Sequence, residues 1–131
     1  MSSTRGAWIV AAARTPVGRR GGGLSGIHPA DLAAVPIRAV LARAGIDGGV
    51  VDDVILGCVG QVGAQASNIG RTAALTAGLP EHVPGMTLDR QCGSSQQAVT
   101  LAAHAIAAGE ADVVVAGGVE AMSLVDRKSV V

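Results

Sequence analysis

The sequence predicts an α/β domain in which a mostly parallel sheet is covered by helices on both faces. Short apolar runs alternate along the chain with segments of helical periodicity, which is typical of βαβ connectivity. The 131 residues are enough for one domain with a modest core. Hydrophobic residues make up 49% of the chain, but it has one Trp and no Phe or Tyr, so the core must consist of closely packed aliphatic side chains.

The N-terminal third is expected to contain one strand and one helix. Residues 8–13 form a short apolar run followed by a turn signal, which predicts a buried strand. After a loop rich in Gly and Arg, Pro29 suits the first turn of a helix that Gly45 ends. Pro36 falls inside this helix, where a proline costs about 3 kcal/mol, so a kink or a restart is expected there.

Five further elements are expected along the rest of the chain. They are strands at 51–59, 85–88 and 111–116, and helices at 68–77 and 94–108. A glycine follows each helix, as is common at helix C-termini. The second helix has an apolar face at spacings of three and four residues, and the last strand is apolar enough to be covered on both faces.

Composition and charge exclude several classes of function. Ten basic and ten acidic residues give a formal net charge of zero, so nothing indicates a nucleic-acid partner. No apolar run approaches the roughly 20 residues that span a bilayer, and residues 1–8 lack an apolar signal core. We expect a cytoplasmic protein with two reduced cysteines and with no bound metal ion or cofactor.

Residues 87–99 place Cys92 between a short strand and a long helix. Such a strand–turn–helix elbow lifts the thiol out of the carboxyl end of the sheet, where α/β proteins bind ligands. The helix N-terminus favours a thiolate and leaves backbone N–H groups free to bind an oxyanion. Because residues 93–95 are small, the approach to the sulfur stays open. Cys92 is therefore the candidate nucleophile.

A single cysteine is nevertheless more often a small buried hydrophobe than a nucleophile, so spacing alone leaves both interpretations of Cys92 open. Cys58 lies within a predicted strand and is expected to be a core residue. His104 lies about three turns, roughly 18 Å, from Cys92 along the predicted helix, so we expect it to be packed or exposed and not to act as a base. Glu120 is expected to anchor a loop or a subunit contact.

Four stretches resemble the thiolase family. Residues 89–99, DRQCGSSQQAV, are similar to the nucleophile region of thiolases, and residues 111–123 continue with a Gly-Gly-x-Glu-x-Met-Ser strand end. Residues 12–18 resemble the first strand and loop of the family, and residues 68–80 resemble the helix before the nucleophile strand. The resemblance covers residues 9–123 and implies a thiolase-like fold, of which this chain is the N-terminal half of the core.

The resemblance implies an acetyl-CoA C-acyltransferase, that is, an acetyl-CoA acetyltransferase or 3-ketoacyl-CoA thiolase. Cys92 would attack the keto carbon of a 3-oxoacyl-CoA, release acetyl-CoA and keep the shortened acyl group until coenzyme A takes it. The reverse reaction is a Claisen condensation. The backbone N–H of Cys92 would help to bind the oxyanion. Coenzyme A and acyl-CoA are thus expected as substrates, and the protein is expected to form a homodimer or tetramer.

The same resemblance exposes missing parts. Thiolases take an activating His, a second catalytic Cys and an Asn-plus-His oxyanion site from a C-terminal half, and none of those motifs occurs in this sequence. We expect residues 1–123 to be an incomplete thiolase N-terminal domain and residues 124–131 to begin a loop domain or an unrelated tail. With the C-terminal domain absent, the fragment is expected to be inactive alone.

Two alternatives to a thiolase stay open. One is a related condensing enzyme that uses the same cysteine elbow, and the other is a non-catalytic acyl-CoA-binding or interaction fragment. The glutamines on both sides of Cys92 favour a degradative fatty-acyl or steroid-type thiolase over a biosynthetic one. The length of the acyl chain does not follow from the sequence.

Overall fold

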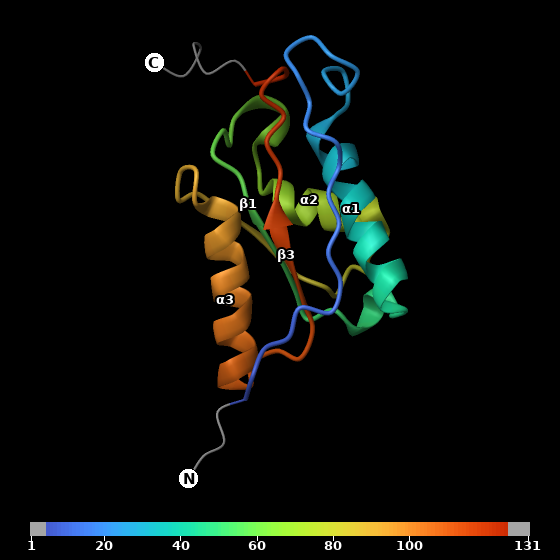
Figure 1. The fold of residues 1–131 in the computed structure, drawn as a ribbon, viewed down its shortest axis with the longest axis vertical. Helices are drawn as coiled ribbons and strands as arrows, with labels where there is room; N and C mark the ends of the chain where they lie inside the picture. Colours follow the sequence, from blue (N-terminus) through green and yellow to red (C-terminus); the bar gives the residue numbers. More distant parts are fainter. Residues whose placement is uncertain (1–4, 126–131) are drawn as a thin grey trace.

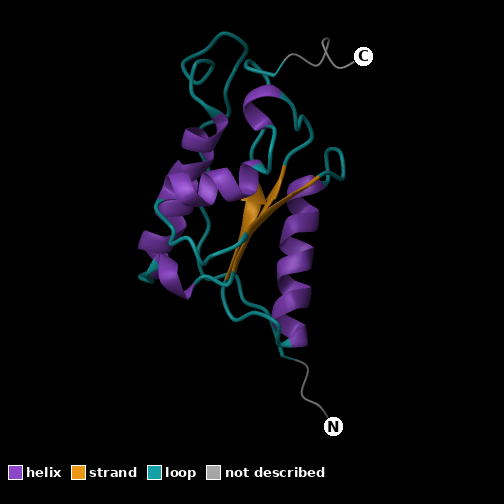
Figure 2. Ribbon diagram, turned by 180° about the vertical axis from the view of Figure 1, so that it is seen from behind, coloured by secondary structure: helices purple, strands orange, loops and turns teal. Residues whose placement is uncertain are grey.

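The computed structural model describes residues 5–125 and has three layers. A three-stranded sheet is made of β1 (Asp53–Gly57), β2 (Gly85–Leu88) and β3 (Val114–Gly118). Helix α3 (Ser94–Ala108) covers one face, and α1 (Pro29–Ala44) and α2 (Ile69–Ala77) cover the other (Figures 1 and 2). Short 3-10 turns occupy Gly48–Val50 and Gly63–Gln65. The predicted parallel α/β architecture is confirmed.

The sheet brings the carboxyl ends of its three strands together. The strand order is β2-β1-β3 and all pairs are parallel. Gly57, the last residue of the central strand, pairs with Leu88 on one side and with Gly118 on the other. The segments that follow the three strands therefore meet at one edge of the sheet, although they are far apart in the sequence.

Alternate side chains of β1 enter two separate cores. Val54 and Leu56, and Cys58 just after the strand, pack among residues of α1 and α2, whereas Ile55 packs against Ala98 and Ala102 of α3. This alternation is the period-two pattern of a strand covered on both faces. Cys58 is 1% exposed, so the prediction that it is a core residue is confirmed.

Helix α1 begins and ends where the sequence predicts, but it does not restart at Pro36. The His28 ring accepts a hydrogen bond from the Ala30 N–H at 3.2 Å, and Gly45 closes the helix with a φ of +67°. The assigned helix runs through Pro36 without interruption. Tertiary packing of the alanine-rich face against α2 offsets the hydrogen bond that a proline cannot donate.

The strand predicted at residues 8–13 is wrong. These residues form no strand and do not join the sheet (Figure 1), and Trp8, Ile9 and Val10 are between 78% and 86% exposed. An apolar run becomes a strand only where it forms ladder hydrogen bonds with another strand. No described strand pairs with residues 8–13, although β2 and β3 are edge strands of the sheet.

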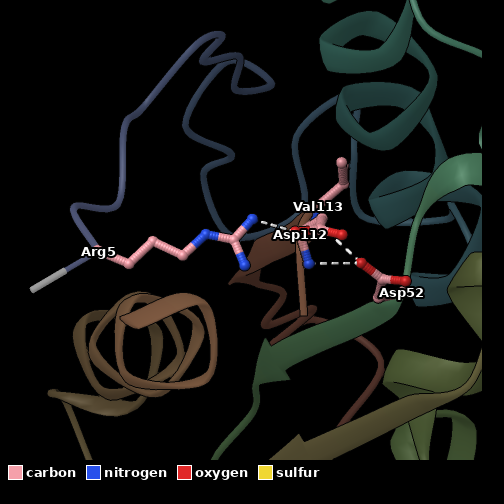
Figure 3. Close-up of polar contacts among 4 residues, drawn as sticks. All are labelled: Arg5, Asp52, Asp112 and Val113. Atoms are coloured by element: carbon pink, nitrogen blue, oxygen red, sulfur yellow. Dashed lines mark hydrogen bonds and ion pairs between the residues drawn. The ribbon is translucent and has the colours of Figure 1, made fainter. Parts of the chain in front are cut away.

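The opposite end of the sheet is fixed by Asp52. Its carboxylate accepts hydrogen bonds from the N–H groups of Asp112, at 2.7 Å, and Val113, at 2.9 Å (Figure 3). These two donors hold the pKa of Asp52 below its ordinary value. Asp112 also forms an exposed ion pair with Arg5. The predicted strand at 111–116 is thus displaced to β3 at 114–118, because its first residues bond to a side chain.

The described helices carry no membrane span, since none is both long enough and apolar enough to cross a bilayer. The expected domain boundary after residue 123 falls just before the end of the described residues. The tail expected from residue 124 lies outside them from residue 126 onward.

Candidate active site

Cys92 lies on the turn between β2 and α3, as the sequence predicts. Strand β2 ends at Leu88, α3 begins at Ser94, and the cysteine between them is exposed. The turn itself needs support, because Gln91 has a φ of +49°. A left-handed conformation costs a non-glycine residue about 1–2 kcal/mol.

The side chain of Ser94 closes this turn. Its hydroxyl accepts a hydrogen bond from the Arg90 N–H at 2.9 Å and donates one to the Gln91 carbonyl at 2.6 Å. Asp89 adds a third bond, since its carboxylate accepts the Gln91 N–H at 2.7 Å. Ser94 is 4% exposed, and a buried hydroxyl with both partners in place resists rearrangement. The elbow is therefore held by its own side chains.

Two glycines let the first turn of α3 lie directly on the strand ends. A Cβ atom at Gly57 would lie 2.5 Å from the backbone nitrogen of Ser95, and one at Gly118 would overlap the Ser95 hydroxyl. The family pattern predicts Gly118, but no local sequence signal explains why either position must be a glycine. The reason is close approach: only a residue without Cβ fits beneath the elbow.

A cavity of about 360 Å³ opens beside the cysteine. Its lining comes from the ends of two strands, residues 57–59 and 118–120, and from the elbow residues Gln91, Cys92, Ser94 and Ser95. A larger open hollow of about 820 Å³ lies beside Arg14 and Arg43, but it contains no nucleophile. The cavity at Cys92 combines a reactive group with a concave wall.

Glu120 anchors a loop, which is one of the two roles that the sequence predicts for it. Its carboxylate accepts hydrogen bonds from the N–H of Val59 at 2.8 Å and of Gly60 at 3.1 Å. It also accepts one from the amide of Gln65 at 3.0 Å. Sequence reasoning did not identify Gln65, because nothing near it in the sequence shows that Glu120, 55 positions later, is its partner.

No imidazole reaches the cavity. His28 caps α1, the His82 ring lies 3.1 Å from the Gly49 carbonyl, and His104 is exposed on α3. The expectation that His104 is packed or exposed is therefore confirmed. Within residues 5–125 there is also no cluster of three or more His, Cys, Asp or Glu side chains that could hold a metal ion.

Cys58 borders the cavity but faces away from the nucleophile. A Cβ atom added at Gly57 would point toward α3. Because side chains alternate along a strand, the next side chain, that of Cys58, enters the core on the opposite face. Burial, and to a smaller extent the charge of Glu120, raises the pKa of the Cys58 thiol to about 11. Cys58 is thus neutral at physiological pH.

Comparison with known proteins gives consistent matches. Residues 7–130 match the family model described as "Thiolase, N-terminal domain". The chain is 57% identical over 123 residues to a steroid 3-ketoacyl-CoA thiolase, FadA6, of Mycobacterium tuberculosis, and 51% identical over 120 residues to a beta-ketoadipyl-CoA thiolase of Escherichia coli. These matches cover 94% and 91% of the chain, but 30% of each relative.

A solved structure agrees with the sequence matches. The Bacillus anthracis acetyl-CoA acetyltransferase superposes with a TM-score of 0.88 and is 45% identical in sequence. The superposition covers 94% of this chain and 31% of that one. The chain therefore spans about 30% of the length of the curated relatives that it matches.

Proposed function

Since this chain belongs to the thiolase family and carries its N-terminal domain, we propose that Cys92 is the nucleophile of an acyl-CoA acyltransferase. One observation carries the proposal: an exposed cysteine at a helix N-terminus opens onto a cavity at the carboxyl edge of a parallel sheet. The acyl group would be carried as a thioester on Cys92, and coenzyme A would act as a substrate rather than as a resident cofactor.

In the cleavage direction, the Cys92 thiolate attacks the keto carbon of a 3-oxoacyl-CoA and forms a tetrahedral oxyanion. When this oxyanion collapses, the bond to the neighbouring carbon breaks, and its electron pair takes up a proton and leaves as acetyl-CoA. The shortened acyl group stays on sulfur until the thiolate of coenzyme A attacks it and restores Cys92. The backbone N–H of Cys92, two residues before α3 begins, would help to stabilise the oxyanion.

The relatives favour a degradative reaction on a 3-oxoacyl-CoA. Their names specify a steroid 3-ketoacyl-CoA and a beta-ketoadipyl-CoA, which share the 3-oxo thioester but differ in the acyl group. We extend only this shared chemistry to the present chain. We also propose that it is a thiolase N-terminal domain up to residue 123, that it works in the cytoplasm, and that the working enzyme is a dimer or tetramer.

Acetyl exchange tests this function. The chain is incubated with acetyl-CoA and isotopically labelled coenzyme A, and the label that enters acetyl-CoA is measured against a protein-free control. We expect slow exchange that Cys92→Ala abolishes, because both half-reactions pass through the thioester. Cys58→Ala is the matched control and should keep the exchange. Exchange that survives in Cys92→Ala contradicts the proposal, whereas a wild-type chain that binds acetyl-CoA without any exchange favours a non-catalytic acyl-CoA-binding role.

A further inference from the structure

Two of the three segments that line the Cys92 cavity are joined to each other by one pair of side chains. Glu120 follows β3, and its carboxylate accepts the N–H groups of Val59 and Gly60, which follow β1. The tie therefore spans the cavity wall from one strand end to the other. Neither Glu120 nor the residues it binds touch the elbow through a described hydrogen bond.

Gln65 completes the tie. It is 0% exposed, and its amide nitrogen donates to the Gly60 carbonyl at 2.7 Å and to Glu120 at 3.0 Å. Its amide oxygen accepts the Ala121 N–H. Among the described residues, no buried side-chain polar atom lacks a partner. A fully satisfied buried network of this kind specifies one geometry, because removing any member leaves a donor or acceptor unpaired.

The elbow and the wall are thus held by separate sets of bonds. Ser94 and Asp89 fix the turn that carries Cys92, whereas Glu120 and Gln65 fix residues 59–60 and 121. A change at Glu120 should therefore move the wall and leave the sulfur in place. The effect on the wall can be distinguished from an effect on the elbow. A reagent that must align against the wall should react more slowly after the change, whereas a reagent with no such requirement should react at an unchanged rate.

We propose that Glu120 and Gln65 are positioning residues for acyl transfer, which hold the cavity wall against which the acyl group of the incoming thioester is aligned with Cys92. This inference rests on the proposed function and extends it to residues that do not touch the sulfur. The positioning acts on the thioester, whose carbonyl must meet the sulfur at a defined angle. A small alkylating agent has no such requirement.

The test compares two reagents in the whole chain. The rate of Cys92 acetylation by S-acetyl-N-acetylcysteamine is measured beside the rate of Cys92 alkylation by iodoacetamide, both by mass spectrometry. The variants are Glu120→Gln, which replaces an acceptor by a donor facing Gln65, and Gly60→Ala, whose Cβ would lie 2.8 Å from the Glu120 carboxylate. Glu110→Gln makes the same chemical change at an exposed glutamate and is the control.

We expect acetylation to slow about tenfold or more in both variants, because an unpaired buried donor lets the wall leave the geometry that aligns the thioester with Cys92. Alkylation should stay within about twofold, because the elbow is intact. Hydrogen exchange at the Val59 and Gly60 amides should accelerate in the same variants and not in Glu110→Gln.

Three outcomes overturn the inference. Acetylation that is unchanged while the two amides exchange faster makes the tie merely structural. Equal slowing of acetylation and alkylation means that the variants disturb the elbow or the fold. Unchanged amide exchange shows that the tie does not hold the wall. A wild-type chain that is alkylated but takes no acetyl group overturns the proposed function itself, whereas wild-type acetylation that the variants leave unaltered overturns this inference alone.

Discussion

Iodoacetamide should alkylate Cys92 at least about a hundredfold faster than Cys58 at pH 8, because a thiol with a pKa of about 11 is then only about 0.1% ionised. Cys92 is exposed beside a helix N-terminus, whereas Cys58 is buried. Peptide mass spectrometry after native labelling measures both rates in one sample. Cys92→Ala should leave the native chain almost unlabelled, and Cys58→Ala should label at the rate of the wild type.

The pH dependence of Cys58 labelling and of the stability of the chain provides a second test of the same prediction. Labelling of Cys58 should increase as the pH approaches about 11. Because its pKa in the folded chain is raised above the ordinary 9.0, the unfolded thiol ionises first. The free energy of unfolding should therefore fall as the pH rises from 9.0 to about 11. Cys58→Ala should remove this contribution to the pH dependence of stability. Preferential labelling of Cys58 at pH 8 would contradict the site.

Thiolysis of a 3-oxoacyl-CoA by the 131-residue chain should be indistinguishable from background. General acid–base help typically contributes about 10²–10⁴-fold, and no histidine or second cysteine faces Cys92 within residues 5–125. Glu120 does not substitute for them, since three donors already occupy its carboxylate. Acetyl exchange is less demanding than thiolysis, because a thiolate leaves readily whereas a carbanion needs a proton donor.

The assay follows the loss of 3-oxoacyl-CoA enolate absorbance in the presence of coenzyme A and the purified chain. The individual losses need not multiply, since catalytic groups act as a unit. A protein-free sample and Cys92→Ala set the background. Turnover well above that background, lost in Cys92→Ala, would mean that this chain holds a complete catalytic set, and the proposed need for further residues would be abandoned.

The elements that the sequence predicted best are those with local signals at both ends. Helix α3 and strand β2 have the predicted bounds, because small residues precede the helix and Gly109 caps it with a φ of +79°. The strand predicted at 8–13 does not form, and the reason is nonlocal, since an apolar run does not reveal whether the segment pairs with another strand. The start of β3 was displaced by Asp52, whose side chain lies 61 positions away from Val113.

The residues of the candidate site also divide into those with local sequence signals and those that depend on distant contacts. Cys92 was predicted from residues adjacent to it, and the loop-anchoring role of Glu120 was one of two possibilities drawn from its place at a strand end. Gln65 and the close approach at Gly57 were not predicted. Both depend on contacts between segments that only the folded sheet brings together. A glutamine or a glycine alone carries no sequence signal for such a contact.

Acyl transfer through Cys92 is tested most directly by locating the acyl group on the chain. The chain is incubated with a high concentration of acetyl-CoA, quenched in acid so that thioesters survive, digested with pepsin and analysed by tandem mass spectrometry. We expect one acetyl group per chain, carried on Cys92, and none on Cys92→Ala. An acetyl group on Cys58 or on another residue, or an unacetylated Cys92 that iodoacetamide still modifies, would contradict it.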